Sequence, residues 1–552
     1  MPAATRSGQP RQRNAFASLP AMSLRVLVVL LPLHLLAGWL FLRGCGPGFP
    51  LDDAWGHLVY GRAVAEGQGF AYNPGQPEAG VSAPLWTLMV ALPAGLVEWT
   101  GWLARPDVLV RLIGGLLGLL MAGVGWRLAL RVGAWPAFWT AVLLSIDPLL
   151  LAGRYSGMEL PLFGLLSLLL VEALLDQRPG RAGLIAGLAV LTRPEGLALA
   201  GITLLVAAAR RWPLRQVMVP LLLCVLPFAA WNEWVAGQLW PTTWSNKFEA
   251  VAPAGPALAV LEALMRDTGW GWALLPLAIV GAVAISGTVP RLEQLLLYVS
   301  LVPLVGVLLT RPMLIGFDPP RVPFYWERYA LIAWAPMLVL VATGAASVAR
   351  TAWAGLRCRP VAALVLIAPA AAAGALAHEL PGHTVDVSRR FAAECADVEA
   401  LNVAAGQWID AHLPLGAVVA THDAGAIRYF GRRPVLDLWG NNDHELNALL
   451  AAQSAARDTA TAGRAQLEIE RYLRSKHPDA LAVFPALYAS GHSPELDEIV
   501  RRYPPEALSA LQTATDFAAF FGLTRRAATF VVPHPAVIES PLHQTMAVFV
   551  AP

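Results

Sequence analysis

The stretch Leu51–Trp86, LDDAWGHLVYGRAVAEGQGFAYNPGQPEAGVSAPLW, decides how the whole chain is interpreted. It places two adjacent acids, Asp52 and Asp53, just after the first long apolar run and before a segment rich in glycine, proline and aromatic residues. Side chains that anchor the ends of membrane helices are mostly Lys and Arg. Acids at this position therefore indicate a site that contacts both a lipid-borne group and a polar one.

The composition of the chain is typical of a polytopic membrane protein. Its 552 residues are 56% hydrophobic and only 14% charged, and the mean hydropathy is +0.54. Soluble domains carry about 25% charged residues. The net charge of +2 and the scattered Lys and Arg residues do not indicate a nucleic-acid partner. Four cysteines do not make a disulfide framework.

The apolar runs predict a polytopic α-helical membrane protein with about 11 transmembrane helices, since a span needs roughly 20 apolar residues. Residues 83–97 are too short a run and contain Pro93, so we expect a half-embedded helix on the outer side. Residues 182–192 and 195–209 are separated by TRPEG, a break of the kind that lines cavities at membrane depth. The predicted spans are 24–43, 108–130, 135–152, 160–176, 182–192, 195–209, 215–235, 270–288, 293–310, 329–347 and 361–379.

Basic residues set the predicted orientation. Residues 1–23 contain several arginines and are expected to be a cytoplasmic tail, followed by a retained first helix rather than a cleaved signal peptide. Arginine-rich connections then alternate along the chain on the cytoplasmic side. The other connections, including the loop 44–107, lie outside and hold the unusual polar residues. Cys45 and Cys395 fall on this same outer side.

The character of the sequence changes at about residue 384, where charges become frequent and apolar runs shrink to strand length. Alternating strand and helix patterns predict an α/β domain over 384–552, after a transmembrane domain over 24–383. An odd number of membrane crossings would place this C-terminal domain outside the cell. The predicted strands are 418–421, 435–438, 481–484 and 546–550, and the predicted helices are 393–413, 443–456, 461–475 and 505–519.

The acids of the outer side are the candidate catalytic groups. Asp52 and Asp53 are expected at a helix N-terminus, where one acid would be enough to cap the helix. Glu159, in RYSGMELPLFG, is also explained either as a helix-start acid or as a member of the site. His57 follows Asp53 by four residues, but the spacing provides no third metal ligand. We therefore expect no bound metal and no cofactor.

Four cations are candidates for binding a phosphate, because Lys supplies a point charge and Arg a bidentate fork. Arg193 lies in the broken stretch, where an ionisable residue is costly and marks a candidate site or a structural ion pair. The others could equally be interfacial or structural residues. The candidate phosphate-binding residues are Arg154, Arg193, Lys247 and Arg328, and the candidate pocket residues are His57, Tyr60, Trp86, Asn246 and Tyr329.

The order of these motifs resembles that of the GT-C class of polytopic glycosyltransferases. One helix is followed by the external DD pair, EGQGFAYNPG, APLW, SGMELPLF, TRPEG, PTTWSNK and ERY. Within the class, the chain is most similar to the mycobacterial terminal arabinofuranosyltransferase group and bacterial relatives that use polyprenyl-phosphate sugars. The resemblance covers most of the chain and is strongest over residues 51–92.

The resemblance implies a catalytic assignment. Asp52 would be the base that activates an acceptor hydroxyl, and Asp53 and Glu159 would orient the base or the acceptor. Cations would stabilise the departing lipid phosphate. The chain departs from the arabinosyl-type pattern at Val59, where those relatives tend to carry Arg, and at residues 79–83. The sugar that is transferred is therefore left open.

The expected function is that of an inverting membrane glycosyltransferase in a bacterial plasma membrane. It would move a sugar from a polyprenyl-phosphate donor to a hydroxyl of a cell-envelope glycan or lipid on the outer face. A protein O-mannosyltransferase-like enzyme with a protein acceptor is an alternative within the class. A flippase or transporter for a lipid-linked solute is an alternative outside it, although transporters usually show repeated halves, and the sequence shows no internal repeat. A non-catalytic scaffold that binds glycans is a third alternative.

This topology predicts the behaviour of a reporter fused after Pro552. A reporter that distinguishes the two sides of the membrane should read extracytoplasmic, because the basic connections alternate and the number of crossings is odd. A cytoplasmic signal would overturn both the orientation and the outer location of the acids.

Overall fold

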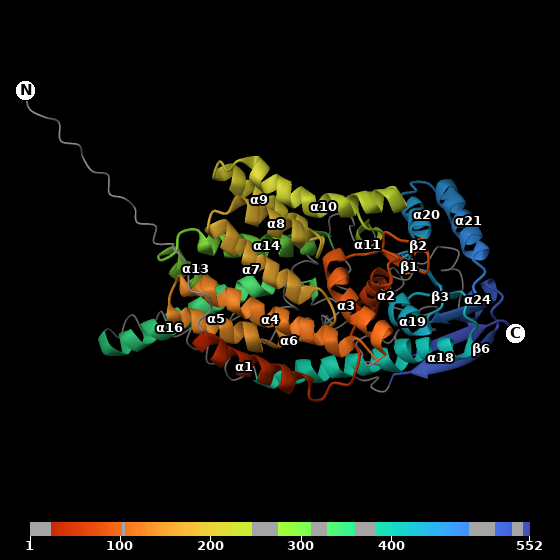
Figure 1. Ribbon diagram of the computed structural model, residues 1–552, viewed down its shortest axis with the longest axis horizontal. Coiled ribbons are helices and arrows are strands. Elements are labelled where there is room, and N and C mark those ends of the chain that lie inside the picture. The colour runs from red at the N-terminus through yellow and green to blue at the C-terminus, as the bar shows by residue number, and fades with distance from the viewer. Residues whose placement is uncertain are drawn as a thin grey trace, which may run out of the picture.

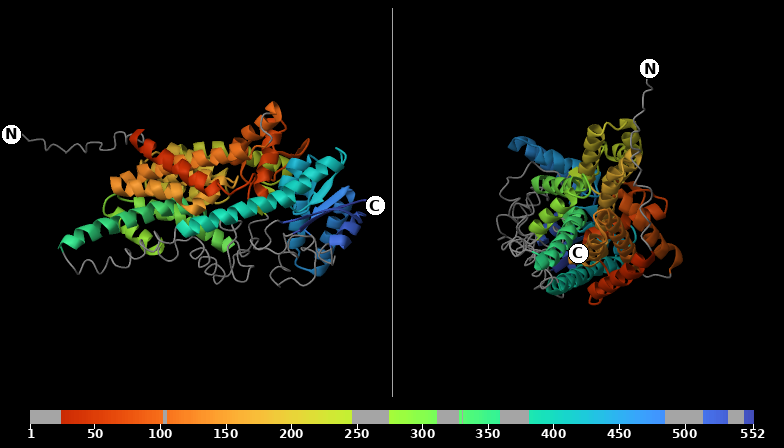
Figure 2. Two further views of the ribbon diagram at one scale, coloured as in Figure 1. Left: turned by 90° about the horizontal axis from the view of Figure 1, so that it is seen from below. Right: turned by 90° about the vertical axis from the view of Figure 1, so that its left-hand side faces the viewer.

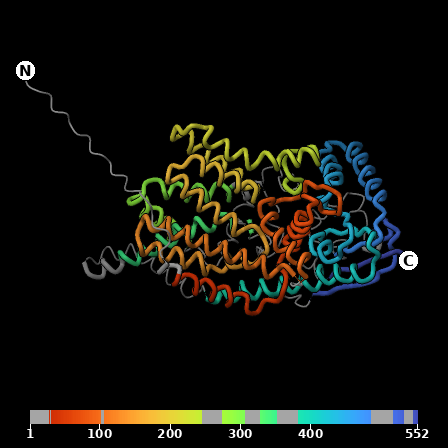
Figure 3. Tube along the Cα trace, viewed as in Figure 1, coloured from red at the N-terminus to blue at the C-terminus, as the bar shows by residue number. Residues whose placement is uncertain are grey.

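A computed structural model describes residues 24–101, 105–245, 274–310, 328–329, 331–358, 381–484, 514–532 and 545–552. The apolar helices gather at one end of an elongated molecule, and a five-stranded sheet lies at the other (Figure 1). The elements α2 (Asp52–Ala65) and α3 (Pro84–Thr100) lie between these two ends. The Cα trace shows the same arrangement without the ribbons (Figure 3).

Helices occupy the apolar runs predicted from the sequence, within the part of the chain that the structure describes. The predicted run 361–379 lies outside these residues. The helices of the apolar end are α1 (Leu24–Leu42), α4 (Asp107–Leu130), α5 (Ala134–Ile146), α6 (Pro148–Tyr155), α7 (Leu160–Leu175), α8 (Pro179–Val190), α9 (Gly196–Ala209), α10 (Leu214–Ala236), α13 (Leu274–Ser286), α14 (Leu292–Thr310) and α16 (Trp334–Cys358).

The structure does not establish the predicted number of eleven spans. Among the described residues, three helices, Asp107–Leu130, Leu214–Ala236 and Leu331–Thr351, are long and apolar enough to cross a membrane alone, and α5 with α6 makes a fourth if the bent pair counts as one span. That pair bends by 52°. The bend has a local cause, because Asp147 caps α6 by accepting from the Leu150 N–H at 3.0 Å and Pro148 begins the new helix.

The sheet near the C-terminus has the strand order β4-β3-β5-β7-β6. Strands β3 (Val419–Thr421), β4 (Val435–Asp437) and β5 (Ala480–Val483) are parallel neighbours, and β6 (Arg525–Val531) and β7 (Thr545–Val550) complete the sheet antiparallel. The four predicted strands are confirmed. The sequence analysis missed β6, because this edge strand is mostly exposed or half-buried and carries no continuous apolar run.

Helices flank this sheet. They are α18 (Ala404–His412), α19 (Ala424–Gly431), α20 (His444–Ser454), α21 (Thr459–Ser475) and α24 (Ala514–Phe520). Of these, α18, α20 and α21 lie where helices were predicted, whereas α19 was not predicted. The described α24 overlaps the end of the predicted helix 505–519, whose residues 505–513 lie outside the described residues. Residues 381–398 are also helical and continue through a π-helical turn, Glu399–Val403, into α18. The helix thus begins earlier than the predicted residue 393 and runs from the apolar end to the sheet (Figures 1 and 2).

This early start is explained by packing against α1. The Ser388 hydroxyl donates to the Phe41 carbonyl at 2.7 Å, and the Phe391 ring lies 5.3 Å from the Phe41 ring in an edge-on contact. Edge-to-face aromatic pairs at this distance stabilise such contacts by about 1 kcal/mol. The contacts fix the first turns of the helix beside the end of α1.

The loop between α1 and α4 docks directly onto the sheet end. Its hairpin consists of β1 (Ala71–Asn73) and β2 (Gln76–Pro77). The Asn73 side-chain amide donates to the Val435 carbonyl and accepts from the Val435 N–H, both at 2.8 Å. The Asn73 side chain therefore pairs with the outer edge of β4 as a neighbouring strand would. It satisfies an N–H and a carbonyl group of β4 that would otherwise lack a hydrogen-bond partner.

Further polar contacts hold the same interface. Arg105 forms a two-pronged ion pair with Glu399, at 2.5 and 2.8 Å, and its guanidinium lies 5.4 Å from the Trp55 ring. Glu78 accepts from the His444 ring at 2.9 Å. The predicted helix 83–97 is confirmed as α3, which packs against α2. Its location on the outer side and its embedding in the membrane surface stay predictions.

The Asn73 contact gives a test of this docking. Replacing Asn73 by Ala should lower the stability of the protein by about 1–3 kcal/mol, because the buried N–H and carbonyl of Val435 each lose a partner. Thermal unfolding in detergent measures the change. Gln76→Ala, at an exposed position in the same hairpin, is the control and should leave the midpoint nearly unchanged. Equal effects of the two variants would contradict the proposed docking role.

Candidate active site

The acid pair stands in the first turn of α2, but it does not cap that helix. The N-cap residue is Leu51, which makes no side-chain cap hydrogen bond. The Asp52 carboxylate instead reaches a second helix: Oδ2 accepts from the Gly425 N–H at 2.7 Å, and Oδ1 accepts from the Ala426 N–H at 2.8 Å. These are free N–H groups of the first turn of α19. One carboxylate therefore joins two helix N-termini, both of which favour negative charge.

The surroundings of Asp52 also change its protonation. Burial raises the pKa of this carboxyl well above its ordinary value, and the nearby Asp423 charge raises it further. The two backbone hydrogen bonds act in the opposite direction and stabilise the carboxylate. Asn402 fixes Asp423 by donating to it at 3.0 Å. Asp52 is thus a half-buried, backbone-bound acid.

Asp53 is placed differently. Its side chain is 46% exposed, and its Oδ2 lies 2.6 Å from Nη1 of Arg328, which is only 2% exposed. Arg328 also donates to the Tyr329 hydroxyl at 3.2 Å and lies 5.0 Å from the Tyr329 ring. The more accessible acid of the pair therefore faces a buried cation that is held by an aromatic ring.

The TRPEG break places a second arginine on the same tyrosine. The Arg193 guanidinium lies 5.5 Å from the Tyr329 ring. It forms a close ion pair with Glu159 and a two-pronged pair with Glu195, at 3.0 and 3.2 Å. Arg193, Glu159 and Glu195 are almost fully buried. The charge of Arg193 is thus already compensated by two carboxylates.

His57 connects these groups to α2. Its Nε2 lies 3.5 Å from Glu159 Oε2, and its Nδ1 lies 3.4 Å from the Thr87 hydroxyl of α3. His57 and Asp53 are four residues apart on α2, which puts them on one helix face. The sequence-predicted residues Asp53, His57, Glu159, Arg193, Arg328 and Tyr329 therefore come together from four separate parts of the chain.

Two tight turns allow this approach. Gly157, in SGMELP, has a positive φ of 76°, and a Cβ there would come within 2.8 Å of Phe49 and Ala54. In the TRPEG break, Gly196 lies against the backbone of Ala189, where no Cβ fits. The Leu191 carbonyl freed by the break accepts from the Leu85 N–H at 3.0 Å. This carbonyl is therefore satisfied by α3.

Two other predicted residues have structural contacts. Arg154 is buried and donates to the carbonyls of Leu144 and, at 2.8 Å, Ser145, so that it closes the C-terminal end of α5. The Trp86 indole donates to the Gly157 carbonyl at 2.9 Å and supports that turn. The predicted residues Asn246 and Lys247 lie outside the described residues.

Tyr60 belongs to a neighbouring polar cluster. Its hydroxyl donates to the Asn442 side chain at 2.9 Å, and Asn442 donates to Asp437 through its N–H at 3.0 Å and its side-chain amide at 2.8 Å. The Trp439 N–H donates to the other oxygen of Asp437 at 2.9 Å. Burial raises the pKa of Asp437 to about 7 despite these bonds.

Sequence reasoning did not foresee that Asp52 binds α19 or that Thr87 supports His57. The motif THDAGAIRYFG indicated only a turn after a strand. Gly425 in this motif is the residue that could have indicated the contact. A side chain there would collide with Asp52, so only glycine allows the close approach. No group of three or more His, Cys, Asp or Glu side chains suited to a metal ion occurs within the described ranges.

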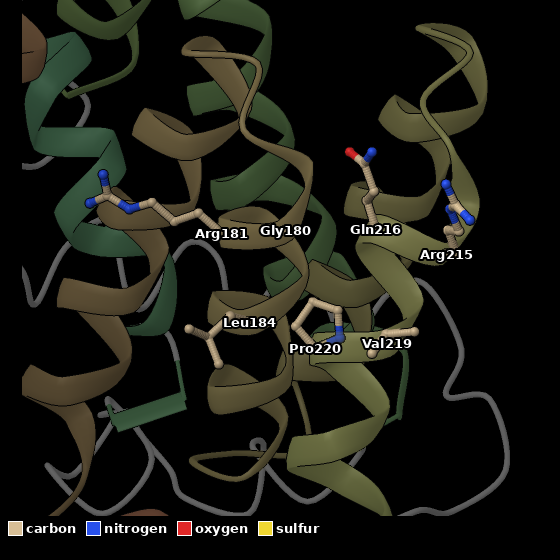
Figure 4. Close-up of a pocket in the computed structure, with 7 residues that line it drawn as sticks. All are labelled: Gly180, Arg181, Leu184, Arg215, Gln216, Val219 and Pro220. Atoms are coloured by element: carbon tan, nitrogen blue, oxygen red, sulfur yellow. The ribbon is translucent and has the colours of Figure 1, made fainter.

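An open groove of about 630 Å³ lies elsewhere, between α8 and α10. Figure 4 shows Arg181 directed away from Arg215 and Gln216, which stand across the groove. The groove lies at the first turns of α8, whereas Arg193 follows the C-terminal end of this helix. At 1.5 Å per residue, Arg193 is roughly 18 Å from Arg181 along the helix. The groove is therefore distinct from the acid pair. Its lining residues are Gly180, Arg181, Leu184, Arg215, Gln216, Val219 and Pro220.

Solved structures with the same fold are GT-C membrane glycosyltransferases. ArnT from Cupriavidus metallidurans bound to undecaprenyl phosphate is 14% identical, with 96% of this chain and 98% of that chain covered and a TM-score of 0.54. The archaeal oligosaccharyltransferase AglB from Archaeoglobus fulgidus, in complex with an inhibitory peptide and a dolichol-phosphate, is 11% identical over 86% of this chain and 73% of that chain, with a TM-score of 0.50. These likenesses define the fold of a membrane protein.

Sequence comparison adds one match. Residues 393–532 fit a family described as a domain of unknown function, DUF8728. No curated protein sequence matches the chain significantly. The structural neighbours support the expected GT-C fold, whereas they do not single out the mycobacterial arabinofuranosyltransferase group.

The Asp437 cluster predicts a pH dependence of stability. The folded pKa of about 7 lies above the ordinary value of 3.8, so the folded protein binds this proton more tightly than the unfolded chain does. The stabilisation is complete below pH 3.8 and is lost as the pH rises towards about 7. The contribution of this group is at most about 4 kcal/mol. The thermal midpoint, measured across this pH range, should therefore include a decrease with rising pH that comes from Asp437.

Asp437→Asn removes the titrating group and is the comparison. Its midpoint should lose the Asp437 component of the pH slope, whatever its absolute stability. An identical pH slope in the two proteins would show that Asp437 does not titrate in this way.

Proposed function

We propose that this protein is a membrane glycosyltransferase that transfers a sugar from a lipid-phosphate donor to a hydroxyl acceptor on the outer face of the membrane. The observation that carries the proposal is the pairing of the half-exposed Asp53 with the buried Arg328, beside Arg193 and Glu159. The fold shared with ArnT and AglB, whose structures contain undecaprenyl phosphate and dolichol-phosphate, supports the donor class.

Asp53 is the better candidate for the base within the acid pair. Both oxygens of Asp52 are engaged by backbone N–H groups of α19. Asp53 has the accessible side chain. The resemblance implies that Asp52 is the base. We assign this role to Asp53 instead, and we assign to Asp52 the positioning of α19.

The cations also divide into two kinds. Arg193 is neutralised by Glu159 and Glu195, and Arg154 is bound to helix carbonyls. We assign both to positioning. Arg328 is buried and faces the accessible acid Asp53, so it is the candidate that binds the donor phosphate, and Lys247 is a second candidate. His57 and Glu159 hold the face of α2 that carries Asp53.

The chemistry is a single displacement. Asp53 accepts the proton of the acceptor hydroxyl while the acceptor oxygen forms a bond to the anomeric carbon. The bond between that carbon and the phosphate oxygen breaks, and the lipid phosphate leaves as an anion on Arg328. A stable leaving anion needs little acid catalysis, so a positioned base and a phosphate-binding cation are the main requirements. The configuration at the anomeric carbon inverts.

The finer assignments remain part of the proposal. The donor lipid is a polyprenyl phosphate, the location is a bacterial plasma membrane, and the C-terminal sheet lies outside the cell. The acceptor is a glycan or lipid of the cell envelope. A protein is the second candidate acceptor, because AglB, which has a similar fold, was solved with an inhibitory peptide.

Substitutions of acidic residues by their amides test the assignment of the base. Asp53→Asn should lower the transfer rate by about 10²–10⁴-fold, the usual contribution of a general base. The binding of the lipid-linked donor should persist. Asp386→Asn, an exposed acid 3.9 Å from Arg389, is the matched control and should leave transfer unchanged. Full activity of Asp53→Asn would remove Asp53 from catalysis.

The activity itself is tested in cells. Deletion of the protein should lead to accumulation of a polyprenyl-phosphate sugar and loss of one sugar from an envelope glycan, lipid or protein, as measured by mass spectrometry. Complementation with the Asp53→Asn variant should reproduce the deletion profile. Unchanged lipid-linked sugars and envelope glycans after deletion would contradict the proposed function.

A further inference from the structure

Two thiols from distant parts of the sequence meet midway along the helical segment 381–412 that leads to the sheet. Cys45 follows α1 in a turn in which its N–H donates to the Leu42 carbonyl at 2.9 Å. Cys395 lies in the helical segment 381–398 and is fully buried, whereas Cys45 is partly exposed. Both cysteines are free thiols, and both sulfurs contact the same guanidinium nitrogen of Arg111.

Arg111 of α4 brings a positive charge to both sulfurs. Its Nη2 lies 3.3 Å from Cys45 Sγ and 3.7 Å from Cys395 Sγ. The same guanidinium donates to the Gly48 carbonyl at 2.6 Å and to the Gly46 carbonyl at 3.1 Å, so that it is held in place. A cation beside a thiol favours the thiolate, which is the reactive form.

The neighbouring contacts keep the two segments in register on either side of the thiols. Ser388 binds the Phe41 carbonyl one to two turns before Cys395, and Glu399 binds Arg105 one turn after it. The thiols thus lie in the middle of a row of contacts between the first loop and the helix 381–412. Their approach does not rest on a single loop conformation.

We propose that Cys45 and Cys395 form a disulfide that covalently joins the end of α1 to the helix leading to the sheet. The proposal uses the outer location of both residues, which is part of the proposed function. Oxidising compartments are where such bonds form and persist. The bond would fix the helix that continues into α18, which packs on α19 and so on the helix end that holds Asp52.

The reaction is thiol–disulfide exchange with a disulfide-bearing oxidant of that compartment. The Cys45 thiolate, which is the accessible one, attacks the oxidant's disulfide and releases one oxidant thiol. The Cys395 thiolate then attacks Cys45 Sγ, forms the Cys45–Cys395 bond and releases the second thiol. Two protons and two electrons leave the protein, and the oxidant disulfide is reduced to two thiols.

The electrostatics are suited to this order of events. The neighbouring Cys395 thiol and the Arg111 charge lower the pKa of Cys45 to about 7. Burial raises the pKa of Cys395. The exposed sulfur is therefore the first nucleophile, and the buried one reacts only after the mixed disulfide has formed beside it.

Oxidation of the purified full chain in detergent tests the pair without reference to topology. Treatment with oxidised glutathione should give a cross-linked peptide that contains Cys45 and Cys395 and lacks two hydrogen atoms, detected by mass spectrometry. The Cys224→Ser/Cys358→Ser double variant retains the pair and should behave like the parent. Cys45→Ser and Cys395→Ser should lose the cross-link and lose the rise in thermal midpoint that oxidation gives the parent.

Thiol trapping in intact cells completes the test. The parent should have Cys45 and Cys395 protected from alkylation until reductant is added. Free thiols in a chain whose C-terminal reporter reads extracytoplasmic, or failure of the purified parent to form the Cys45–Cys395 peptide, would overturn the proposal. A cytoplasmic reporter together with a cross-link in the purified chain would support the pairing and reject the outer location.

Discussion

The structure depends on one carboxylate that binds the N-terminus of a helix far away in the sequence. Asp52 opens α2 and accepts two N–H bonds from the first turn of α19. Hydrogen bonds from backbone N–H groups to a charged acceptor stabilise by about 1.5–3 kcal/mol each, and an unpaired buried carboxylate is costly. The first loop and the sheet end are thereby fixed relative to each other, and Asp53 is left pointing at Arg328.

This constraint gives the two adjacent acids different surroundings. Asp52 binds backbone N–H groups of α19, whereas Asp53 keeps an accessible side chain that faces Arg328. The same division holds among the arginines, because Arg154 closes a helix and Arg193 balances two glutamates, whereas Arg328 faces the accessible acid. Contacts from Asn73, Arg105 and Glu78 spread the docking over a wide interface. The site is therefore built between two parts of the chain, rather than within one of them.

The sequence predicted the local elements well, because apolar runs and short buried strands have clear periods. It also selected Asp53, His57, Glu159, Arg193 and Arg328 as candidates, since charged residues between apolar runs stand out, and the structure brings them together. Their partners were not predictable: the bond from Asp52 to Gly425 spans 373 positions, and nothing local to either residue encodes it. Strand β6 was missed because its side chains are largely exposed, and the bend at Asp147 was missed because its two halves read as one apolar run.

Hydrogen–deuterium exchange at the start of α19 tests the central claim most directly. In the parent protein, the peptide that contains the Gly425 and Ala426 amides should exchange slowly, because both amides donate to Asp52. In Asp52→Ala the same peptide should exchange markedly faster, while peptides from β5 and β7 in the sheet stay protected. Equal protection of α19 in the two proteins would contradict the account, because it would show that Asp52 does not hold the two parts of the chain together.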